Sequence, residues 1–222
     1  MPIRLDERLT EIARLAEGAD TVCDVGSDHG KLACWLVQTG RAARVIATDI
    51  SAPSLKKAER LAEELGLADE VPTRVGDGLD PIADGEADVV VIAGMGGDLI
   101  ARILERAREQ GKRFGRFVLS PNTHAERVRE QLQRMGHTVV HDGSVGCAGK
   151  DYTVIATREG GEEKFDALQL AFGKFFATDG EFRARAAAEL AQINGLLAGN
   201  PGAASLAERK RLLEEALKEC AE

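Results

Sequence analysis

An apolar, β-branched run that breaks into a glycine turn constrains the fold of this chain more than any other stretch. Residues 21–25 are Thr-Val-Cys-Asp-Val, which is the composition of a buried strand, and Gly-Ser-Asp-His-Gly follows at 26–30. The apolar residues at 31–37 then indicate a helix. A strand, a tight turn and a helix in this order predict an α/β sheet whose first turn faces a ligand crevice.

The acids of this turn restrict the ligand. Gly26 and Gly30 are two glycines four residues apart, whereas the dinucleotide motif has three. Asp24 and Asp28 disfavour a pyrophosphate and favour a ligand with cationic or hydroxylated groups. S-adenosylmethionine (SAM) carries an ammonium, a sulfonium and a ribose diol, so it fits this charge pattern better than NAD does. The alternative is an ordinary turn in which an Asp or Ser caps the helix.

Two later strands are also predicted to end in acids. Asp49 closes the strand at 44–49, 23 residues after Gly26, close to the spacing of about 20 residues at which an acid meets a ribose diol. Asp77 follows the strand at 71–75, and in SAM-dependent folds an acid there accepts the adenine amino group. Each residue also has a simpler explanation, a helix cap for Asp49 and an Asp-Gly turn for Asp77.

The following strands complete the sheet. The run at 88–93 leads into Gly-Met-Gly-Gly at 94–97, and the strand at 117–120 ends on Pro121-Asn122. We therefore predict five βα units after an N-terminal helix, and then an antiparallel pair at 138–145 and 152–157. Such an antiparallel ending is typical of the class I methyltransferase fold rather than of a dinucleotide-binding Rossmann domain.

The composition changes after the glycine pair at 160–161. We expect one domain at 1–160 and a second at 161–222, where apolar residues recur at helical spacing. Two helices joined by Gly-Asn-Pro-Gly at 199–202 predict a helical hairpin, preceded by a shorter helix. For the phenylalanines at 165–176 we favour core packing over base stacking.

Charge and composition exclude several classes of protein. No run approaches the roughly 20 apolar residues of a membrane span, and the N-terminus lacks the pattern of a signal peptide, which favours the cytoplasm. The net charge is -8, so any binding of nucleic acid needs local basic patches. The four cysteines have no CxxC spacing and predict no metal site.

Five motifs taken together resemble one known family. They lie at 4–9 (Arg-Leu-Asp-Glu-Arg-Leu), 24–29, 76–79, 92–97 and 119–122. Their order and spacing resemble the bacterial tRNA (adenine-N1)-methyltransferase family, the TrmK type, which modifies adenine 22 in the D-arm of tRNA. The likeness covers about residues 4–157 and is looser over the tail, a coiled-coil-like appendage in that family. Thr48-Asp49 departs from the glycine and longer acid common in relatives, and Ser120 from a common glutamine.

The resemblance implies a class I SAM-dependent methyltransferase (Rossmann-like) fold, S-adenosyl-L-methionine as cofactor and tRNA as partner. Asn122 is then expected to hydrogen-bond the adenine edge, with the backbone of 94–97 as the wall beside it. The residues assigned to the cofactor are Asp24, Gly26, Ser27, Asp28, Asp49, Ile50, Gly76, Asp77, Gly78, Ala93 and Gly94. Those assigned to catalysis are Asn122, Asp28, His29, Gly94, Met95 and Gly96, with His29 either a base or simply a polar neighbour.

Two groups of basic residues are candidates for holding tRNA. The first lies on the N-terminal helix and comprises Arg4, Arg8 and Arg14. The second comprises Arg102, Arg106, Arg108, Lys112, Arg113 and Arg116. Solvated helix faces are the alternative explanation for each.

Other functions remain open at this point. The same loops suit a SAM-dependent methyltransferase that acts on another RNA, a protein or a small molecule. A non-catalytic SAM-binding module is a further alternative. The sequence leaves the oligomeric state and the set of tRNA substrates open.

Overall fold

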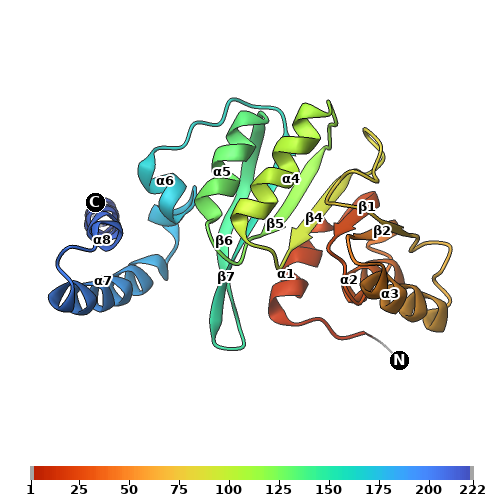
Figure 1. Ribbon diagram of the computed structural model, residues 1–222, viewed down its shortest axis with the longest axis horizontal. Coiled ribbons are helices and arrows are strands. Elements are labelled where there is room, and N and C mark those ends of the chain that lie inside the picture. The colour runs from red at the N-terminus through yellow and green to blue at the C-terminus, as the bar shows by residue number, and fades with distance from the viewer. Residues whose placement is uncertain (1–2, 221–222) are drawn as a thin grey trace. The chain divides into compact units, whose positions relative to one another are not determined.

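The structure is a computed structural model that describes residues 3–220 (Figure 1). The chain forms two compact units, Met1–Glu163 and Lys164–Glu222. The boundary between them lies three residues beyond the one expected at residue 160. Each unit has its own hydrophobic core.

The first unit is built on a seven-stranded sheet with the order β3-β2-β1-β4-β5-β7-β6. Strands β1 to β5 are parallel, whereas β7 runs antiparallel to both β5 and β6. This arrangement confirms the predicted class I methyltransferase fold. The strands are β1 (Ala19–Val25), β2 (Ala42–Asp49), β3 (Thr73–Val75), β4 (Val89–Ala93), β5 (Arg116–Ser120), β6 (His137–Cys147) and β7 (Lys150–Glu159).

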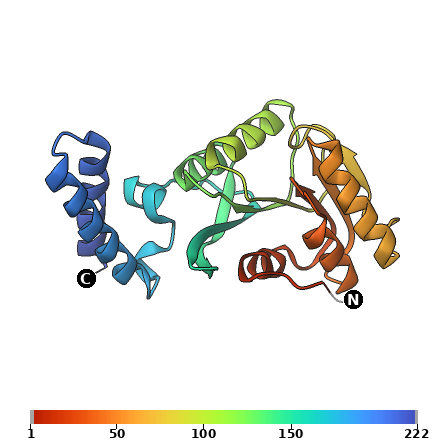
Figure 2. The same cartoon turned by 60° about the horizontal axis from the view of Figure 1, so that its bottom comes forward.

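Helices cover both faces of this sheet. Helix α1 lies on one face and α4 and α5 lie on the other (Figure 2). Helix α1 contacts α2, which in turn contacts α3, and α4 packs on α5. The helices are α1 (Glu7–Ala16), α2 (Lys31–Gln38), α3 (Ala52–Leu65), α4 (Gly97–Glu109) and α5 (Ala125–Arg134).

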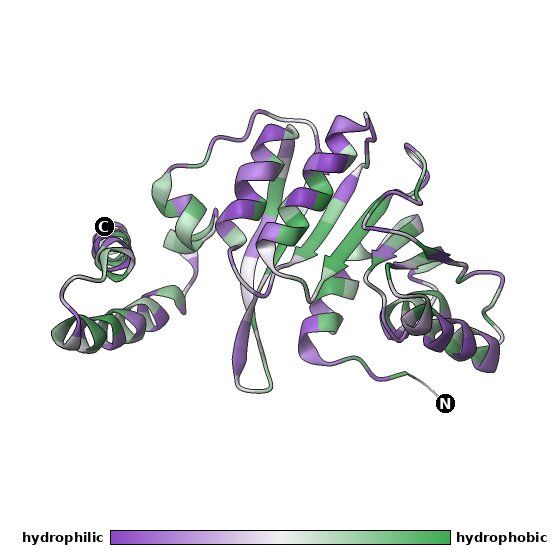
Figure 3. Cartoon of the chain, viewed as in Figure 1, coloured by the Kyte–Doolittle hydropathy of each residue, from purple (hydrophilic) through white to green (hydrophobic). Residues whose placement is uncertain are grey.

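The central strand of the sheet, β4, is buried in the first unit. The four residues at 89–92 of β4 are fully buried, because helices cover both faces of this strand. Figure 3 shows β4 and β5 as hydrophobic, whereas the outer sides of α4 and α5 are hydrophilic. The ends of these strands therefore hold their loops on a rigid base.

The structure corrects several predicted boundaries. Only four of the five parallel strands are followed by a helix, because turns fill the Gly- and Pro-containing stretch between β3 and β4. Strand β3 begins at Thr73 rather than at 71, since Pro72 has no N–H to donate to the sheet. The sequence predicts a helix that begins at Leu99, whereas α4 begins two residues earlier, at Gly97. The β6–β7 strands are longer than expected and leave only residues 148–149 between them.

The second unit consists of helices, and this confirms the predicted helical hairpin. Helices α7 (Phe182–Gly199) and α8 (Ala204–Glu219) pack together, preceded by α6 (Ala167–Phe172) and a short 3-10 helix, η1 (Phe176–Thr178). The ring centroid of Phe182 lies 5.3 Å from that of Phe172 and 5.2 Å from that of Phe176. Phe176 and Phe182 are buried and Phe172 packs against them, which agrees with the predicted core packing, whereas Phe175 is 39% exposed and lies outside this core. No helix among residues 3–220 combines the length and apolar character needed to cross a membrane.

Candidate active site

The predicted ligand loops meet at one edge of the sheet. Strand β1 pairs with β2 on one side and with β4 on the other, so the chain order reverses beside β1. In open α/β sheets the crevice at the carboxyl ends of such strands is where ligands bind. The loops after β1, β2, β3, β4 and β5 all lie along this edge.

The turn after β1 is held by the neighbouring strand and requires glycine. The backbone N–H groups of Gly26 and Ser27 donate to the carbonyl of Thr48, at 2.7 and 3.0 Å. Gly26 has a φ of 76°, which is left-handed, and a Cβ there would collide with the Met95 side chain. Met95, from the loop after β4, therefore packs directly against this turn.

Asp24 supplies a buried carboxyl group beneath the turn. Its side chain is 6% exposed and accepts a hydrogen bond of 2.6 Å from the Ser27 hydroxyl. Burial raises the pKa of Asp24 to about 6, and the negative charge of Asp49 acts in the same direction, whereas the Ser27 hydrogen bond opposes them. At neutral pH the group is mostly ionised, and a cationic ligand would replace the water that it has lost.

A cavity of about 260 Å³ opens over this turn, and most of the residues that were predicted to bind the cofactor at this turn line it. Arg8 of α1 also lines this cavity, although its place among the N-terminal arginines predicts a contact with tRNA phosphate. The lining residues are Arg8, Leu9, Asp24, Gly26, Ser27, Asp28, His29, Lys31, Leu32 and Ala93.

Asp28 and His29 lie at the exposed rim of this cavity. Their side chains pair with each other. The Lys57 ammonium lies 3.8 Å from Asp28 Oδ1 and 3.4 Å from His29 Nε2. This network faces solvent, and it supports a polar role at the rim more directly than it supports a base.

The end of β2 offers a second acid and an exposed apolar side chain. Asp49 Oδ1 accepts a hydrogen bond of 2.8 Å from the Ser51 N–H, whereas Oδ2 accepts none from the residues that the structure describes. Ile50 is 71% exposed. A free carboxylate oxygen beside an exposed aliphatic side chain suits a ribose and the flat base attached to it.

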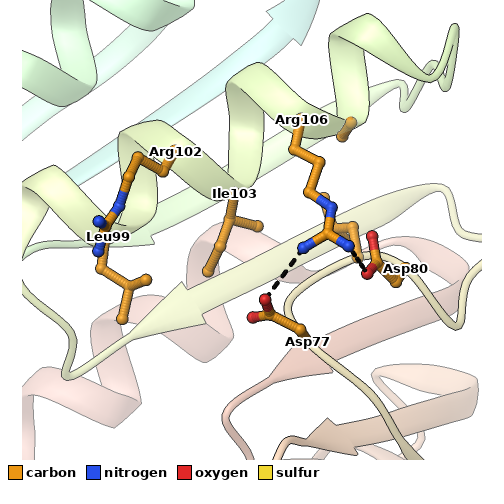
Figure 4. A pocket seen from close by; sticks show the side chains of 8 residues that line it. Asp77, Asp80, Leu99, Arg102, Ile103 and Arg106 are labelled. Carbon is orange, nitrogen blue, oxygen red and sulfur yellow. Dashed lines mark hydrogen bonds and ion pairs between the residues drawn. The ribbon is translucent and has the colours of Figure 1, made fainter.

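Asp77 lies in a separate cavity of about 400 Å³ between the loop after β3 and helix α4. Arg106 Nη1 donates to Asp77 Oδ2 at 3.0 Å, and the same guanidinium contacts Asp80 (Figure 4). Gly78 of this loop backs onto Ile103, and the Gly76 N–H donates to the carbonyl of Asp49 at 3.1 Å. Arg106 therefore pairs with the carboxylate of Asp77, which was predicted to bind adenine. Asp77 and Asp80 in turn balance the positive charge of Arg106.

Asn122 joins the loops that follow β4 and β5. Its Nδ2 donates to the Gly94 carbonyl at 2.7 Å, and its backbone N–H donates to the Met95 carbonyl at 2.8 Å. Its Oδ1 accepts a long hydrogen bond of 3.5 Å from Arg8 Nη1. The predicted juxtaposition of the two loops is therefore present, with Gly96 as the residue before α4.

Comparisons with known proteins agree with this geometry. Residues 5–155 match the family described as "Methyltransferase domain". The tRNA (adenine(22)-N(1))-methyltransferase of Bacillus subtilis (strain 168) is 35% identical over 172 residues, which are 77% of this chain and 72% of that protein. The chain belongs to the tRNA (adenine(22)-N(1))-methyltransferase family. This confirms the resemblance drawn from the five motifs.

Solved structures of similar proteins extend over almost the whole chain. The crystal structure of the Bacillus subtilis m1A22 tRNA methyltransferase TrmK is 31% identical, has a TM-score of 0.85 and covers 97% of this chain and 99% of its own. Sp1610 of Streptococcus pneumoniae, in complex with S-adenosyl-L-methionine, is 29% identical, has a TM-score of 0.85 and covers 96% and 100%. Both units of this chain thus have counterparts in these structures.

Members of this family use S-adenosylmethionine, and the residues of this chain fit it. Asp24 provides a buried anion for an ammonium, the left-handed Gly26 leaves the turn without a side chain over the ligand, and Asp49 keeps one oxygen free. Among residues 3–220, no group of three or more His, Cys, Asp or Glu side chains could hold a metal ion.

Apart from Arg8, which lines the cavity, the basic residues predicted to hold tRNA fall into three kinds. Lys112 and Arg116 donate to backbone carbonyls within the first unit, so their roles there are structural. Arg14 and Arg106 pair with acids. The exposed arginines that form no ion pair within residues 3–220 are Arg4, Arg102, Arg108 and Arg113. Arg4 was predicted on the N-terminal helix but lies before it, because α1 begins at Glu7 after its N-cap Asp6.

Sequence reasoning missed one side chain at this site, Tyr152 of β7. The guanidinium carbon of Arg8 lies 4.7 Å from the centroid of its ring. Tyr152 is the only tyrosine of the chain, and a single tyrosine in the last predicted strand was the available signal. Its approach to α1 depends on tertiary packing, which no local pattern reports.

Proposed function

We propose that this chain transfers the methyl group of S-adenosylmethionine to N1 of adenine 22 in tRNA. The observation that carries this is the position of Asn122, whose amide is bonded to Gly94 beside the cavity that contains Asp24 and Gly26. The named activity of the Bacillus subtilis relative supports the choice of acceptor. The proposed place of action is the bacterial cytoplasm.

Chemistry at adenine N1 makes modest demands on the protein. When bound, S-adenosylmethionine supplies an electrophilic methyl group on a sulfonium. Neutral adenine carries a lone pair and no proton at N1, so no side chain has to act as a base. Holding the two reactants in line contributes roughly 7–11 kcal/mol in favourable cases. A site made of backbone groups, one amide and carboxylates is adequate for this task.

The chain's own residues divide between the two reactants. Asp24 and the 26–28 turn hold the amino-acid end of the cofactor, Asp49 holds its ribose, and Ile50 packs against its base. The Asp77 loop flanks that base, provided that Arg106 yields the carboxylate. On the acceptor side, Asn122 Oδ1 accepts from the exocyclic amine, while the backbone of 94–96 forms the wall.

The acceptor adenine has to leave its stacked position before N1 becomes accessible. The exposed Arg4 and Arg102 and the half-buried Arg8 are the proposed contacts to phosphate. Because the net charge is -8, tRNA binding has to depend on a few local contacts between arginines and phosphates. Binding should therefore weaken steeply as salt is added.

The proposal is tested with labelled S-adenosylmethionine and two tRNA transcripts that differ only at position 22. The transcript with adenine 22 should yield N1-methyladenosine, and the transcript with guanosine 22 should stay unlabelled. Labelling of both transcripts would show that the methylated nucleotide is not adenine 22. If neither transcript is labelled and a protein or small molecule is methylated instead, tRNA is not the substrate.

We expect the substitution Asp49→Ala to weaken cofactor binding. The loss of a charge-assisted hydrogen bond to the ribose corresponds to about 1.5–3 kcal/mol. Titration calorimetry with S-adenosylmethionine measures this directly. The control is Asp69→Ala, since Asp69 is an exposed acid of the turn before β3. Equal affinities in the two variants would remove Asp49 from the ribose role.

We expect a chain that ends at Glu163 to keep its affinity for S-adenosylmethionine and to methylate tRNA poorly. The first unit has its own core and contains every residue that we assign to the cofactor. The second unit is proposed to help hold tRNA. Calorimetry and a methylation assay on the same folded preparation separate the two effects. Full tRNA methylation by the shortened chain would contradict the proposed role of residues 164–222.

A further inference from the structure

Arg8 and Tyr152 form a stack beside the acceptor pocket. The guanidinium of Arg8 lies over the ring of Tyr152 at 4.7 Å, and both residues are half-buried. The same guanidinium contacts Asn122 Oδ1 and lies 3.9 Å from the position that a Cβ on Gly94 would take. One cation therefore stacks on the chain's only tyrosine, contacts the loop after β5 and faces Gly94 of the loop after β4.

The sheet register explains why Tyr152 is at this place. Strand β7 pairs with β5 at Leu119 and Ile155. Continued past the end of β5, this register brings Asn122 level with Tyr152. The β6–β7 hairpin extends beyond the neighbouring strands (Figure 1), so Tyr152 stands where the loop after β5 leaves the sheet.

We propose that the Tyr152 ring is the surface on which the acceptor adenine stacks, and that Arg8 occupies this surface until the base arrives. The inference rests on the proposed function. A guanidinium is flat and cationic and stacks on aromatic faces. Adenine is also flat, and aromatic side chains are common stacking partners for bases that leave the stack.

The charge that develops during the reaction favours this surface. The N1 lone pair forms the new N–C bond, the C–S bond breaks, and its electron pair stays on sulfur. The positive charge moves from sulfur to the adenine ring. The face of the Tyr152 ring attracts cations, so it stabilises the methylated base more than the neutral one. Such a difference accelerates the chemical step rather than binding alone.

Arg8 has to leave the ring when the base enters. Its departure separates its positive charge from the charge that develops on adenine, and it frees Asn122 Oδ1 to accept from the exocyclic amine. Within residues 3–220 no carboxylate lies within ion-pair distance of Arg8, so no strong partner holds it in place. The displaced guanidinium can then pair with a phosphate of the target nucleotide.

A second stack in the same unit serves as a comparison. Arg41 lies over the Trp35 ring at 5.2 Å, but it also pairs with Glu17 at 2.7 Å. Arg41 immediately precedes β2 and so lies at the opposite edge of the sheet from the ligand loops. Arg41→Gln is therefore the matched control for Arg8→Gln.

The experiment combines kinetics with a signal that does not depend on turnover. Tyr152→Leu should lower kcat/KM for tRNA on the order of ten- to a hundredfold, as expected for a lost stacking partner. Tyr152→Phe keeps the ring and should stay within about threefold of the parent chain, and both variants should bind S-adenosylmethionine as the parent does. Arg8→Gln should act mainly on KM for tRNA, whereas Arg41→Gln should change neither parameter.

The single tyrosine supplies the second readout. In the full chain with 13C-labelled tyrosine, the ring resonance of Tyr152 should shift upfield when tRNA is added. A tRNA that lacks the base at position 22 should not produce this shift.

Three results would overturn the inference while leaving the proposed function intact. The first is a folded Tyr152→Leu protein that methylates tRNA within about threefold of the parent rate, and the second is an equal ring shift with the abasic tRNA. A fall in S-adenosylmethionine affinity that matches the loss of kcat/KM would also overturn it, by placing Tyr152 at the cofactor. Failure of the parent chain to methylate any tRNA would overturn both the inference and the proposed function.

Discussion

Asn122→Ala should lower the rate of tRNA methylation on the order of ten- to a thousandfold, because the acceptor base loses its orientation. The side chain makes the 2.7 Å hydrogen bond to the Gly94 carbonyl and presents Oδ1 toward the pocket. The backbone bond from residue 122 to the Met95 carbonyl survives the substitution, so the loops stay joined. The affinity for S-adenosylmethionine should therefore be nearly unchanged.

Single-turnover kinetics and calorimetry on the same preparation test this expectation. Thr123→Ala is the matched control, since Thr123 is the next residue of the loop and is also exposed. A normal methylation rate in a folded Asn122→Ala protein would show that Asn122 does not orient the acceptor adenine. Equal losses of cofactor affinity and rate would instead place Asn122 on the cofactor side.

The cofactor side of the pocket could be predicted from sequence because its determinants are local. A strand, a glycine turn and a helix lie within 17 residues of one another, at 21–37. Asp24, Gly26 and Ala93 then meet because parallel strands bring their carboxyl ends to one edge. Hydrophobic periodicity predicted the order of these strands along the chain. The reversal of strand order beside β1 then places their loops around one crevice.

The partners of charged side chains could not be predicted in the same way. Arg8 was expected on a tRNA-facing helix, and Arg106 in a basic patch. In the structure Arg8 faces the pocket and Arg106 neutralises Asp77. Long flexible side chains choose among several acceptors within reach, and only tertiary packing decides which acceptors those are.

One departure from the family pattern concerns a buried side chain directly before the acceptor loop. Ser120 replaces a common glutamine directly before the Pro-Asn pair. Its side chain is fully buried, and its Oγ has no hydrogen-bond partner within residues 3–220. Its backbone carbonyl still accepts the Gly94 N–H at 3.1 Å. Ser120 does not line the cavity over the first turn, and its backbone still joins the loop after β4 to the loop that carries Asn122.

Gly97→Ala should destabilise the first unit by about 3 kcal/mol or more, since overpacking at a rigid contact has a large effect. Gly97 is buried at the start of α4, and its N–H donates to the Thr123 carbonyl at 2.8 Å. A Cβ at this position would lie 2.5 Å from the same Thr123 oxygen and closer still to the carbonyl oxygen of His124. Backbone oxygens cannot turn away as a side chain can, so the loops after β4 and β5 have to separate.

Thermal unfolding measures this effect, with Gly96→Ala as the neighbouring control. A Cβ on Gly96 would lie 3.4 Å from Thr123 Oγ1, an ordinary contact with a movable hydroxyl. We expect a fall in Tm of roughly 6–12 °C for Gly97→Ala and a change of about 1 kcal/mol or less for Gly96→Ala. Because the loops that separate are those joined by Asn122, the surviving Gly97→Ala protein should also methylate tRNA slowly at temperatures where it is fully folded. Equal stabilities for the two variants would contradict the close packing of these loops.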